Sequence, residues 1–225
     1  MMKNIKIFVF DVGNTLIETK RGPFISKQVL EDLYTLRKKG FYLGLSTLRT
    51  EEMIAPILGI FKFDFLILMN GGLIKIGDSV LFSCPLEGSV VSRIKKQASE
   101  CGTEVIDYCY DGAIYALELP SAKDRFNVSD EYQSYIWEKS GNIDITPKGI
   151  TKVHGLNFVC RQLAVQPSEI VAFGDGYNDI DMLKTAGISV AMGGAPDEVC
   201  EVATITTSTA GEDGVSVALR ELEII

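Results

Sequence analysis

Short apolar runs that end at polar residues are the most regular feature of this sequence. Four of them occupy residues 7–10, 41–45, 65–69 and 170–173, and a fifth occupies residues 188–192. Apolar runs of this length predict strands that are buried on both faces, as in a parallel sheet. The first four runs are followed by the polar residues Asp11, Thr47, Asn70 and Asp175. Because the carboxyl ends of parallel strands lie at one edge of a sheet, these side chains are expected to gather there.

Stretches with the spacing of amphipathic helices separate the apolar runs. Ser26 is expected to cap a helix that ends near Gly40, and further helices are predicted over residues 51–58 and 152–163. Strands that alternate with helices predict a parallel sheet covered by helices on both faces.

Residues 80–144 follow a different pattern. The elements expected there are a helix over residues 90–100, alternating segments over residues 104–108 and 114–119, and a helix over residues 129–139. This order predicts a small α+β unit built on an antiparallel sheet. The chain is therefore predicted to form an α/β core from residues 1–79 and 145–225, with an inserted α+β cap over residues 80–144.

The net charge, the histidine count and the cysteines limit the kinds of partner, metal site and cellular compartment that are expected. The 225 residues carry a net charge of -8, with a pI near 4.8, which argues against nucleic-acid binding because that requires clustered Lys and Arg. A single histidine excludes a His-rich metal site, and five scattered cysteines without a CxxC pair are typical of reduced intracellular thiols. The apolar stretch Ile7–Phe10 is too short for a signal peptide or a membrane span. A cytoplasmic protein without nucleic-acid or membrane partners is expected, and its oligomeric state is left open.

The residues at the strand ends suit phosphoryl transfer. In that reaction a carboxylate can accept the phosphoryl group covalently, while a cation and fixed donors stabilise the charge of the transferring group. Asp11 is predicted to be this nucleophile. Mg²⁺ binds oxygen ligands, including one or two carboxylates, and Asp11 and Asp175 are the predicted ligands. Asp179 is expected to bind the ion directly or to orient a bound water, and the backbone carbonyl of Gly13 is expected on the metal.

Two side chains are predicted to bind the phosphate directly. Lys152, at the start of a helix, would hold a phosphate oxygen and offset the repulsion between Asp11 and the incoming anion, so it is assigned a catalytic role with Asp11. The hydroxyl of Thr47 is expected to donate to another phosphate oxygen, with Ser46 as the alternative.

Loop residues complete the predicted site. The backbone N–H groups of Gly13 and Asn14 can form a small anion-binding nest, since Gly13 has no side chain. Asn70 either contacts the substrate or only shapes the turn that follows it. Asn178, in the segment that carries Asp175, is assigned to the same phosphate or substrate site. Most aromatic side chains of the cap are expected in its core or on its surface, with one or two at the substrate cleft.

Several segments resemble the motifs of one known family. Residues 10–16, Phe-Asp-Val-Gly-Asn-Thr-Leu, look like the first motif of the haloacid dehalogenase superfamily. Residues 146–152 and 171–179 are similar to the third and fourth motifs of its Cof-type sugar-phosphate phosphatases, and residues 191–195 and 211–215 continue the likeness. The resemblance implies a Rossmann-like core, a small C2-type cap between the second and third motifs, Mg²⁺ dependence and an aspartyl-phosphate intermediate.

Three positions depart from the motifs of that family. Its phosphatases usually carry a second aspartate two positions after the nucleophile, as general acid and base, and Gly13 stands there. Thr47-Leu48-Arg49 replaces the usual Thr-Gly-Arg, and residues 193–195, Gly-Gly-Ala, replace the usual Gly-Asn-Ala. General acid–base catalysis contributes roughly 10²–10⁴-fold. Turnover is therefore expected to be slower, unless Asn14 or a metal-bound water substitutes.

The expected function is that of a Mg²⁺-dependent phosphatase, which hydrolyses a small phosphorylated metabolite such as a sugar phosphate. One alternative is a phosphate-binding or regulatory protein whose turnover was lost with the carboxylate at position 13. A second alternative is a phosphomutase. The sequence of the cap does not name the substrate.

Overall fold

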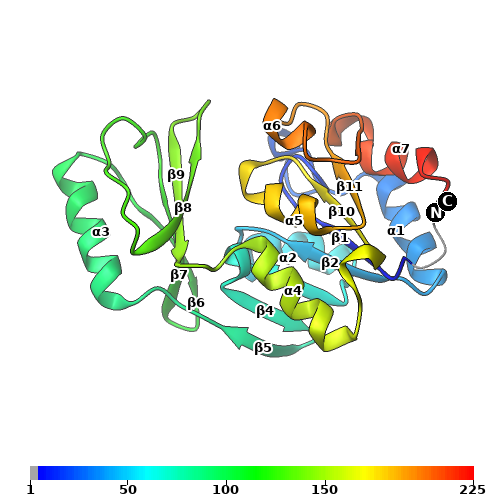
Figure 1. The fold of residues 1–225 in the computed structure, drawn as a ribbon, viewed down its shortest axis with the longest axis horizontal. Coiled ribbons are helices and arrows are strands. Elements are labelled where there is room, and N and C mark those ends of the chain that lie inside the picture. Colours follow the sequence, from blue (N-terminus) through cyan, green and yellow to red (C-terminus); the bar gives the residue numbers. More distant parts are fainter. Residues whose placement is uncertain (1–4) are drawn as a thin grey trace.

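The larger part of the molecule is built on an eight-stranded sheet, whose arrangement can be followed in Figure 1. The computed structural model describes residues 5–225, so the first four residues of the predicted core lie outside the described residues. The strand order is β12-β11-β10-β1-β2-β3-β4-β5. Its strands are β1 (Ile7–Phe10), β2 (Tyr42–Ser46), β3 (Phe65–Leu68), β4 (Leu73–Ile76), β5 (Ser79–Ser83), β10 (Ile170–Gly174), β11 (Ile188–Ala191) and β12 (Ile205–Thr206). Neighbours from β12 to β3 are parallel, and β4 and β5 are antiparallel. The predicted α/β fold with a parallel sheet is confirmed.

Helices cover both faces of the large sheet because the side chains of its strands alternate between two apolar clusters. Phe8 and Phe10 of β1 lie in one cluster, and Ile7 and Val9 lie in the other. The helices of the first cluster are α1 (Lys27–Lys38), α2 (Glu51–Ile60) and α7 (Gly214–Glu221), and those of the second are α4 (Lys152–Leu163), α5 (Ile180–Thr185) and α6 (Asp197–Cys200). None of the helices within residues 5–225 combines the length and the apolar character needed to cross a membrane.

Side-chain caps fix where three of these helices begin, among them α1 and α4. Ser26 Oγ accepts a hydrogen bond from the N–H of Val29 at 3.1 Å, and the predicted cap of α1 is confirmed. Thr151 Oγ1 accepts a hydrogen bond from the N–H of His154 at 3.2 Å. Such caps contribute about 1 kcal/mol to helix stability. The second cap places Lys152 in the first turn of α4.

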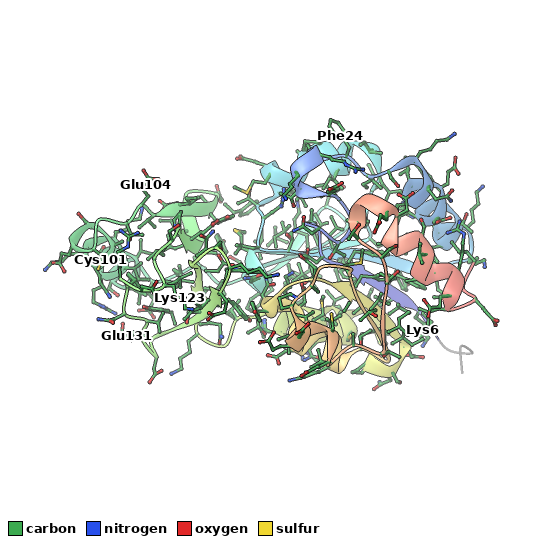
Figure 2. All side chains as sticks on the ribbon, turned by 90° about the horizontal axis from the view of Figure 1, so that it is seen from above. Lys6, Phe24, Cys101, Glu104, Lys123 and Glu131 are labelled. Atoms are coloured by element: carbon green, nitrogen blue, oxygen red, sulfur yellow. The ribbon has the colours of Figure 1, made fainter. Side chains whose placement is uncertain are left out.

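A four-stranded antiparallel sheet forms the smaller part of the molecule, between β5 and α4 in the chain (Figure 1). Its order is β6-β7-β9-β8, with β6 (Ile106–Tyr110), β7 (Ala113–Leu119), β8 (Tyr132–Trp137) and β9 (Asn142–Pro147). Helix α3 (Gly88–Glu100) covers one face, where Ile94 lies in one cluster with Leu117 and Ile143. The other face is turned toward the large sheet, and from above Glu104 lies on the smaller unit and Lys6 on the larger (Figure 2). This arrangement is consistent with a cap.

The predicted helix over residues 129–139 is wrong, because this segment contains strand β8. Its residues are mainly aromatic and β-branched, which favours a strand. Tyr132 and Ile136 pack in the cluster beside α3, whereas Trp137 lies on the opposite face. All of β8 pairs with β9, a strand that the sequence analysis did not assign. This segment therefore forms a strand through its pairing with β9, which lies outside residues 129–139.

The chain passes between the two sheets close to the predicted cap boundaries. Strand β5 (Ser79–Ser83) pairs within the large sheet, and β9 (Asn142–Pro147) pairs within the small one. The division into residues 1–79, 80–144 and 145–225 stays a prediction. Strand pairing favours boundaries that lie a few residues later, after β5 and after β9.

A tight turn connects β9 to α4. The hydroxyl of Thr146 donates to the carbonyl of Ile150 at 3.0 Å, and the N–H of Ile150 donates to the carbonyl of Pro147, also at 3.0 Å. Gly149 has a φ of 74°, a left-handed conformation that glycine adopts without strain. Only this turn and the cap of α4 separate the smaller sheet from Lys152.

Candidate active site

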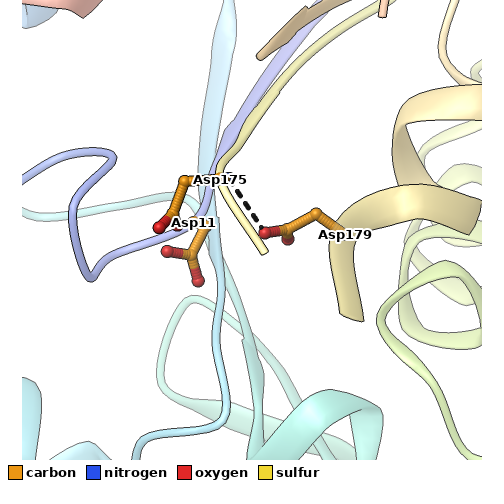
Figure 3. A group of neighbouring side chains, drawn as sticks. All are labelled: Asp11, Asp175 and Asp179. Atoms are coloured by element: carbon orange, nitrogen blue, oxygen red, sulfur yellow. Dashed lines mark hydrogen bonds between the residues drawn. The ribbon is translucent and has the colours of Figure 1, made fainter. Parts of the chain in front are cut away.

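Three carboxylates meet at the carboxyl edge of the large sheet (Figure 3). Asp11 follows β1, and Asp175 follows β10, which is the parallel neighbour of β1. Asp179 belongs to a short 3-10 turn, η4 (Tyr177–Asp179), after β10. Each residue offers an oxygen within 4.8 Å of the oxygens of the other two. The structure thus brings together the three side chains that the sequence assigned to a metal.

Lys152 neutralises part of this negative charge. Its Nζ lies 2.6 Å from Asp11 Oδ1 and 2.7 Å from Asp179 Oδ1, and the side chain is only 1% exposed. Burial acts to lower the pKa of Lys152, but the charges of Asp11 and Asp179 outweigh it and hold that pKa above its ordinary value. Lys152 is therefore a fixed ammonium group that holds one oxygen of Asp11.

Asp179 also shapes the loop that carries Asp175. Its Oδ2 accepts hydrogen bonds from the N–H of Asp175 at 3.1 Å, drawn in Figure 3, and from the N–H of Gly176 at 3.0 Å. Gly174 leaves room for this carboxylate, because a Cβ at residue 174 would lie 2.6 Å from the side chain of Asp179. The side chain of Asp179 therefore fixes the loop and also belongs to the acidic site, which is the cluster of Asp11, Asp175 and Asp179.

The acidic site has more negative than positive charge. Burial raises the pKa of Asp175 above its ordinary value, and the charges of Asp11 and Asp179 raise it further. Burial also raises the pKa of Asp179, although Lys152 opposes this shift. A donor set of oxygens only, with charge left unbalanced, fits Mg²⁺. Asp11, Asp175 and Asp179 are the residues that would hold the ion, and the role of the Gly13 carbonyl stays a prediction.

The loop after β1 has a left-handed turn at Asn14, whose φ is 53°. Its side-chain oxygen accepts a hydrogen bond from the N–H of Thr19 at 3.4 Å. A Cβ added at Gly13 would lie 3.3 Å from Thr19 Oγ1 and 3.5 Å from Arg49 Nη2. The space beside Gly13 is therefore bordered by a guanidinium group rather than by a second carboxylate.

Hydroxyl and amide groups border the site from neighbouring loops. Thr47 Oγ1 accepts the N–H of Arg49 at 3.2 Å, which leaves the hydroxyl proton free to donate. Ser46 Oγ is buried without a partner among the described residues. Asn178 Nδ2 donates to Asn70 Oδ1 at 3.0 Å, and Asn70 Nδ2 is buried with no partner within residues 5–225. Asn70 also has a left-handed φ of 53°, so its two predicted roles are compatible.

The smaller sheet contacts the loop of Asp175 through Trp137. The ring of Trp137 lies 6.1 Å from the ring of Tyr177, centroid to centroid, and a Cβ at Gly176 would lie 2.6 Å from its edge. Trp137 Nε1 donates to Asp144 Oδ2 at 2.7 Å. Burial raises the pKa of Asp144 to about 7, against the opposing effect of this hydrogen bond. A side chain of the small sheet thus rests on the loop that carries the predicted metal ligand.

A second polar group of the small sheet surrounds Glu118. The hydroxyl of Tyr108 donates to one of its oxygens at 2.6 Å, and Asn142 Nδ2 donates to the other at 2.8 Å. The sequence analysis did not identify Glu118, Asn142 or Asp144. The available signal was the alternation of polar residues with isoleucine over residues 142–146, which is typical of a strand with one buried face.

Comparison with known proteins places these residues in a family. The haloacid dehalogenase-like hydrolase family matches residues 8–136 and 119–219. A phosphoglycolate phosphatase from Methanopyrus kandleri is 25% identical over 232 residues, which cover 96% of each chain. A Streptococcus pyogenes protein, assigned as a bifunctional phosphatase and peptidyl-prolyl cis-trans isomerase, is 26% identical over 99% of this chain. The chain spans 55% of the length of that relative.

A solved structure supports the same fold. The sugar phosphatase BT4131, of HAD subclass IIB, has a TM-score of 0.85 at 23% sequence identity, with 98% of this chain and all of that chain covered. Since the family match includes the loops of both Asp11 and Asp175, the predicted enzyme class is confirmed, and the chain belongs to the haloacid dehalogenase-like hydrolases.

Proposed function

We propose that this protein is a Mg²⁺-dependent phosphatase, which hydrolyses small phosphate esters through an aspartyl-phosphate on Asp11. The observation that carries the proposal is the buried contact of Lys152 with Asp11 and Asp179, beside Asp175. It combines a held carboxylate, a fixed cation and an acidic site that fits Mg²⁺. The relatives named as phosphatases for phosphoglycolate and for a sugar support a small phosphate ester as substrate.

The proposed reaction has two steps at phosphorus. Lys152 holds Oδ1 of Asp11, so Oδ2 is the oxygen that attacks the phosphorus of the substrate. As the bond between Asp11 and phosphorus forms, the ester P–O bond breaks and its electron pair stays on the departing oxygen. Water then attacks phosphorus, and phosphate and a proton are released as the Asp11 carboxylate returns. When bound, Mg²⁺ would supply positive charge for the phosphoryl oxygens.

The remaining predicted residues are proposed as donors to the phosphate or the substrate. They are Thr47, Asn70, Asn178 and the backbone N–H groups of Gly13 and Asn14. The free hydroxyl proton of Thr47 and the unpartnered Nδ2 of Asn70 support this assignment. Buried donors of this kind gain a partner when an anion binds.

The test is phosphate release from p-nitrophenyl phosphate and from a panel of phosphorylated metabolites, with Mg²⁺ or with EDTA. The wild type and Asp78→Asn, which changes an exposed carboxylate, should release phosphate only with Mg²⁺. Asp11→Asn should release none. Phosphate release that does not depend on Asp11 would contradict the proposed mechanism.

Gly13 is the observation that favours a second candidate, a phosphate-binding protein with little turnover. This candidate predicts Mg²⁺-dependent binding of inorganic phosphate with no release from any ester. A phosphomutase would instead convert one phosphorylated isomer into another with little free phosphate. Product analysis by ³¹P NMR separates the three outcomes.

A further inference from the structure

Arg49 has a positive charge that no described residue neutralises. Within residues 5–225, its guanidinium group takes part in no ion pair and in no hydrogen bond, although the side chain is half-buried. Its backbone, by contrast, is held, because its N–H donates to Thr47 and its carbonyl accepts the N–H of Met69 at 3.4 Å. A guanidinium group stays charged and binds oxyanions with two parallel N–H donors. Arg49 therefore has a held backbone and a cation that has no anionic partner within residues 5–225.

The guanidinium group lies between the nucleophile loop and the smaller sheet. Its Nη2 is 3.5 Å from the position of a Cβ at Gly13. Burial and the bond to Glu118 raise the pKa of Tyr108, a residue of the small sheet, whereas the charge of Arg49 acts to lower it. Strands β7 and β8 of this sheet contact the loops at the carboxyl edge of the large sheet. Arg49 thus occupies the side of the site that faces the cap.

That side receives the leaving group. In an in-line displacement, the departing oxygen lies opposite the attacking one, so a substrate attacked by Asp11 directs its leaving group away from the large sheet. Lys152 is not available to the leaving group, because its ammonium group is held by Asp11 and Asp179. Gly13 offers no carboxyl group that could supply a proton. On that side Arg49 offers N–H donors, which stabilise an anion without protonating it.

We propose that Arg49 stabilises the departing oxygen as an anion, and that the enzyme selects phosphate esters whose leaving groups are stable anions, such as aryl phosphates. The inference rests on the proposed function and narrows its substrate class. It disfavours alkyl phosphates, such as those in the names of the relatives, because their leaving groups are strongly basic alkoxides. The electron pair of the broken P–O bond stays on the leaving oxygen. This oxygen remains bound to Arg49 and takes a proton from water after release.

The experiment compares three substrates of similar shape: p-nitrophenyl, phenyl and benzyl phosphate. For the wild type with Mg²⁺, kcat/KM should fall steeply in that order. Arg49→Met should lower kcat/KM for phenyl phosphate by roughly 10²–10³-fold, the usual effect of losing one oxyanion donor. The loss should be smaller for p-nitrophenyl phosphate, because its leaving oxygen develops less charge. Arg161→Met, on the exposed side of α4, serves as the matched control.

Arg49→Lys guards against a failure of Arg49→Met to fold, because it keeps the charge and should retain part of the rate for phenyl phosphate. A loss in Arg49→Lys that is equal for all three substrates would overturn the inference.

The remaining outcomes separate this inference from the function on which it rests. An equal loss for all three substrates in Arg49→Met would assign Arg49 to the phosphoryl group, and no loss would give it no role. Either result overturns the inference and leaves the phosphatase intact. Absence of Mg²⁺-dependent turnover in the wild type would overturn both.

Discussion

Replacement of Lys152 by methionine removes one charge and keeps most of the apolar stem. In the wild type, the ammonium group lies 2.6 Å from Asp11 and 2.7 Å from Asp179, and Lys152 and Asp179 each have side chains 1% exposed. Without it, the carboxylates of Asp11, Asp175 and Asp179 would have no ion-pair partner among residues 5–225. Lys152→Met is therefore expected to lose both activity and stability.

The expected loss of stability follows from this burial. Removal of one partner from a buried ion pair costs about 3–5 kcal/mol, because the other partner remains buried and charged. For a chain of this length, each kcal/mol lowers the melting temperature by about 2–4 °C, so a decrease of about 6–20 °C is expected. Excess Mg²⁺ should restore more stability to the variant than to the wild type, since the ion replaces the missing charge.

The assay is urea unfolding followed by circular dichroism, with and without Mg²⁺. Lys95→Met is the matched control, because the ion pair of Lys95 with Asp107 is also 2.6 Å long, but its side chains are 42% and 33% exposed. Exposed pairs contribute about 0.2–1 kcal/mol. Equal losses in the two variants would refute the argument from burial. A variant that Mg²⁺ does not stabilise would refute the acidic site as the place where the ion binds.

Three further measurements probe the site and the cap. Asp11→Asn should reduce phosphate release to background with an unchanged circular dichroism spectrum, and retained activity would place the nucleophile elsewhere. Activity should disappear in excess EDTA, and Ca²⁺ should restore it poorly because its coordination is looser and higher; full activity in EDTA would contradict the metal role. Because burial raises the pKa of Asp144 to about 7, its contribution to stability is present below about pH 4 and is lost as the pH rises to about 7. Relative to Asp144→Asn, the wild-type free energy of unfolding should fall by on the order of 2 kcal/mol from about pH 5 to pH 7, and parallel urea profiles would contradict this.

The elements of the core were predictable because their signals are local. The apolar run before Asp11 and the helix that begins at Lys152 each carry their own pattern, and the structure gives both segments the predicted type. The convergence of Asp11, Asp175 and Asp179 follows from one rule, that parallel strands end at the same edge. The sequence was therefore enough to predict that these three carboxylates lie close together.

The cap was harder to predict because its strands depend on distant partners. The aromatic and β-branched residues of β8 favour a strand only weakly, and its pairing with β9 completes the strand. The approach of Arg49 to Gly13 was equally hidden, since it depends on how two loops from different strands lie against each other. Such contacts depend on tertiary packing, which the periodicity of the sequence does not predict.

The turn between β9 and α4 links the position of the small sheet to the position of Lys152. Two hydrogen bonds stiffen this turn, so a rotation of the small sheet that the turn does not absorb displaces the first residue of α4. The contacts of Lys152 with its two carboxylates are short and buried, and a shift of about 1 Å would break them. Opening of the cap for product release would then also disturb the charge balance around Asp11. Access to the site and the ion pair of Asp11 with Lys152 are therefore coupled through one short piece of backbone.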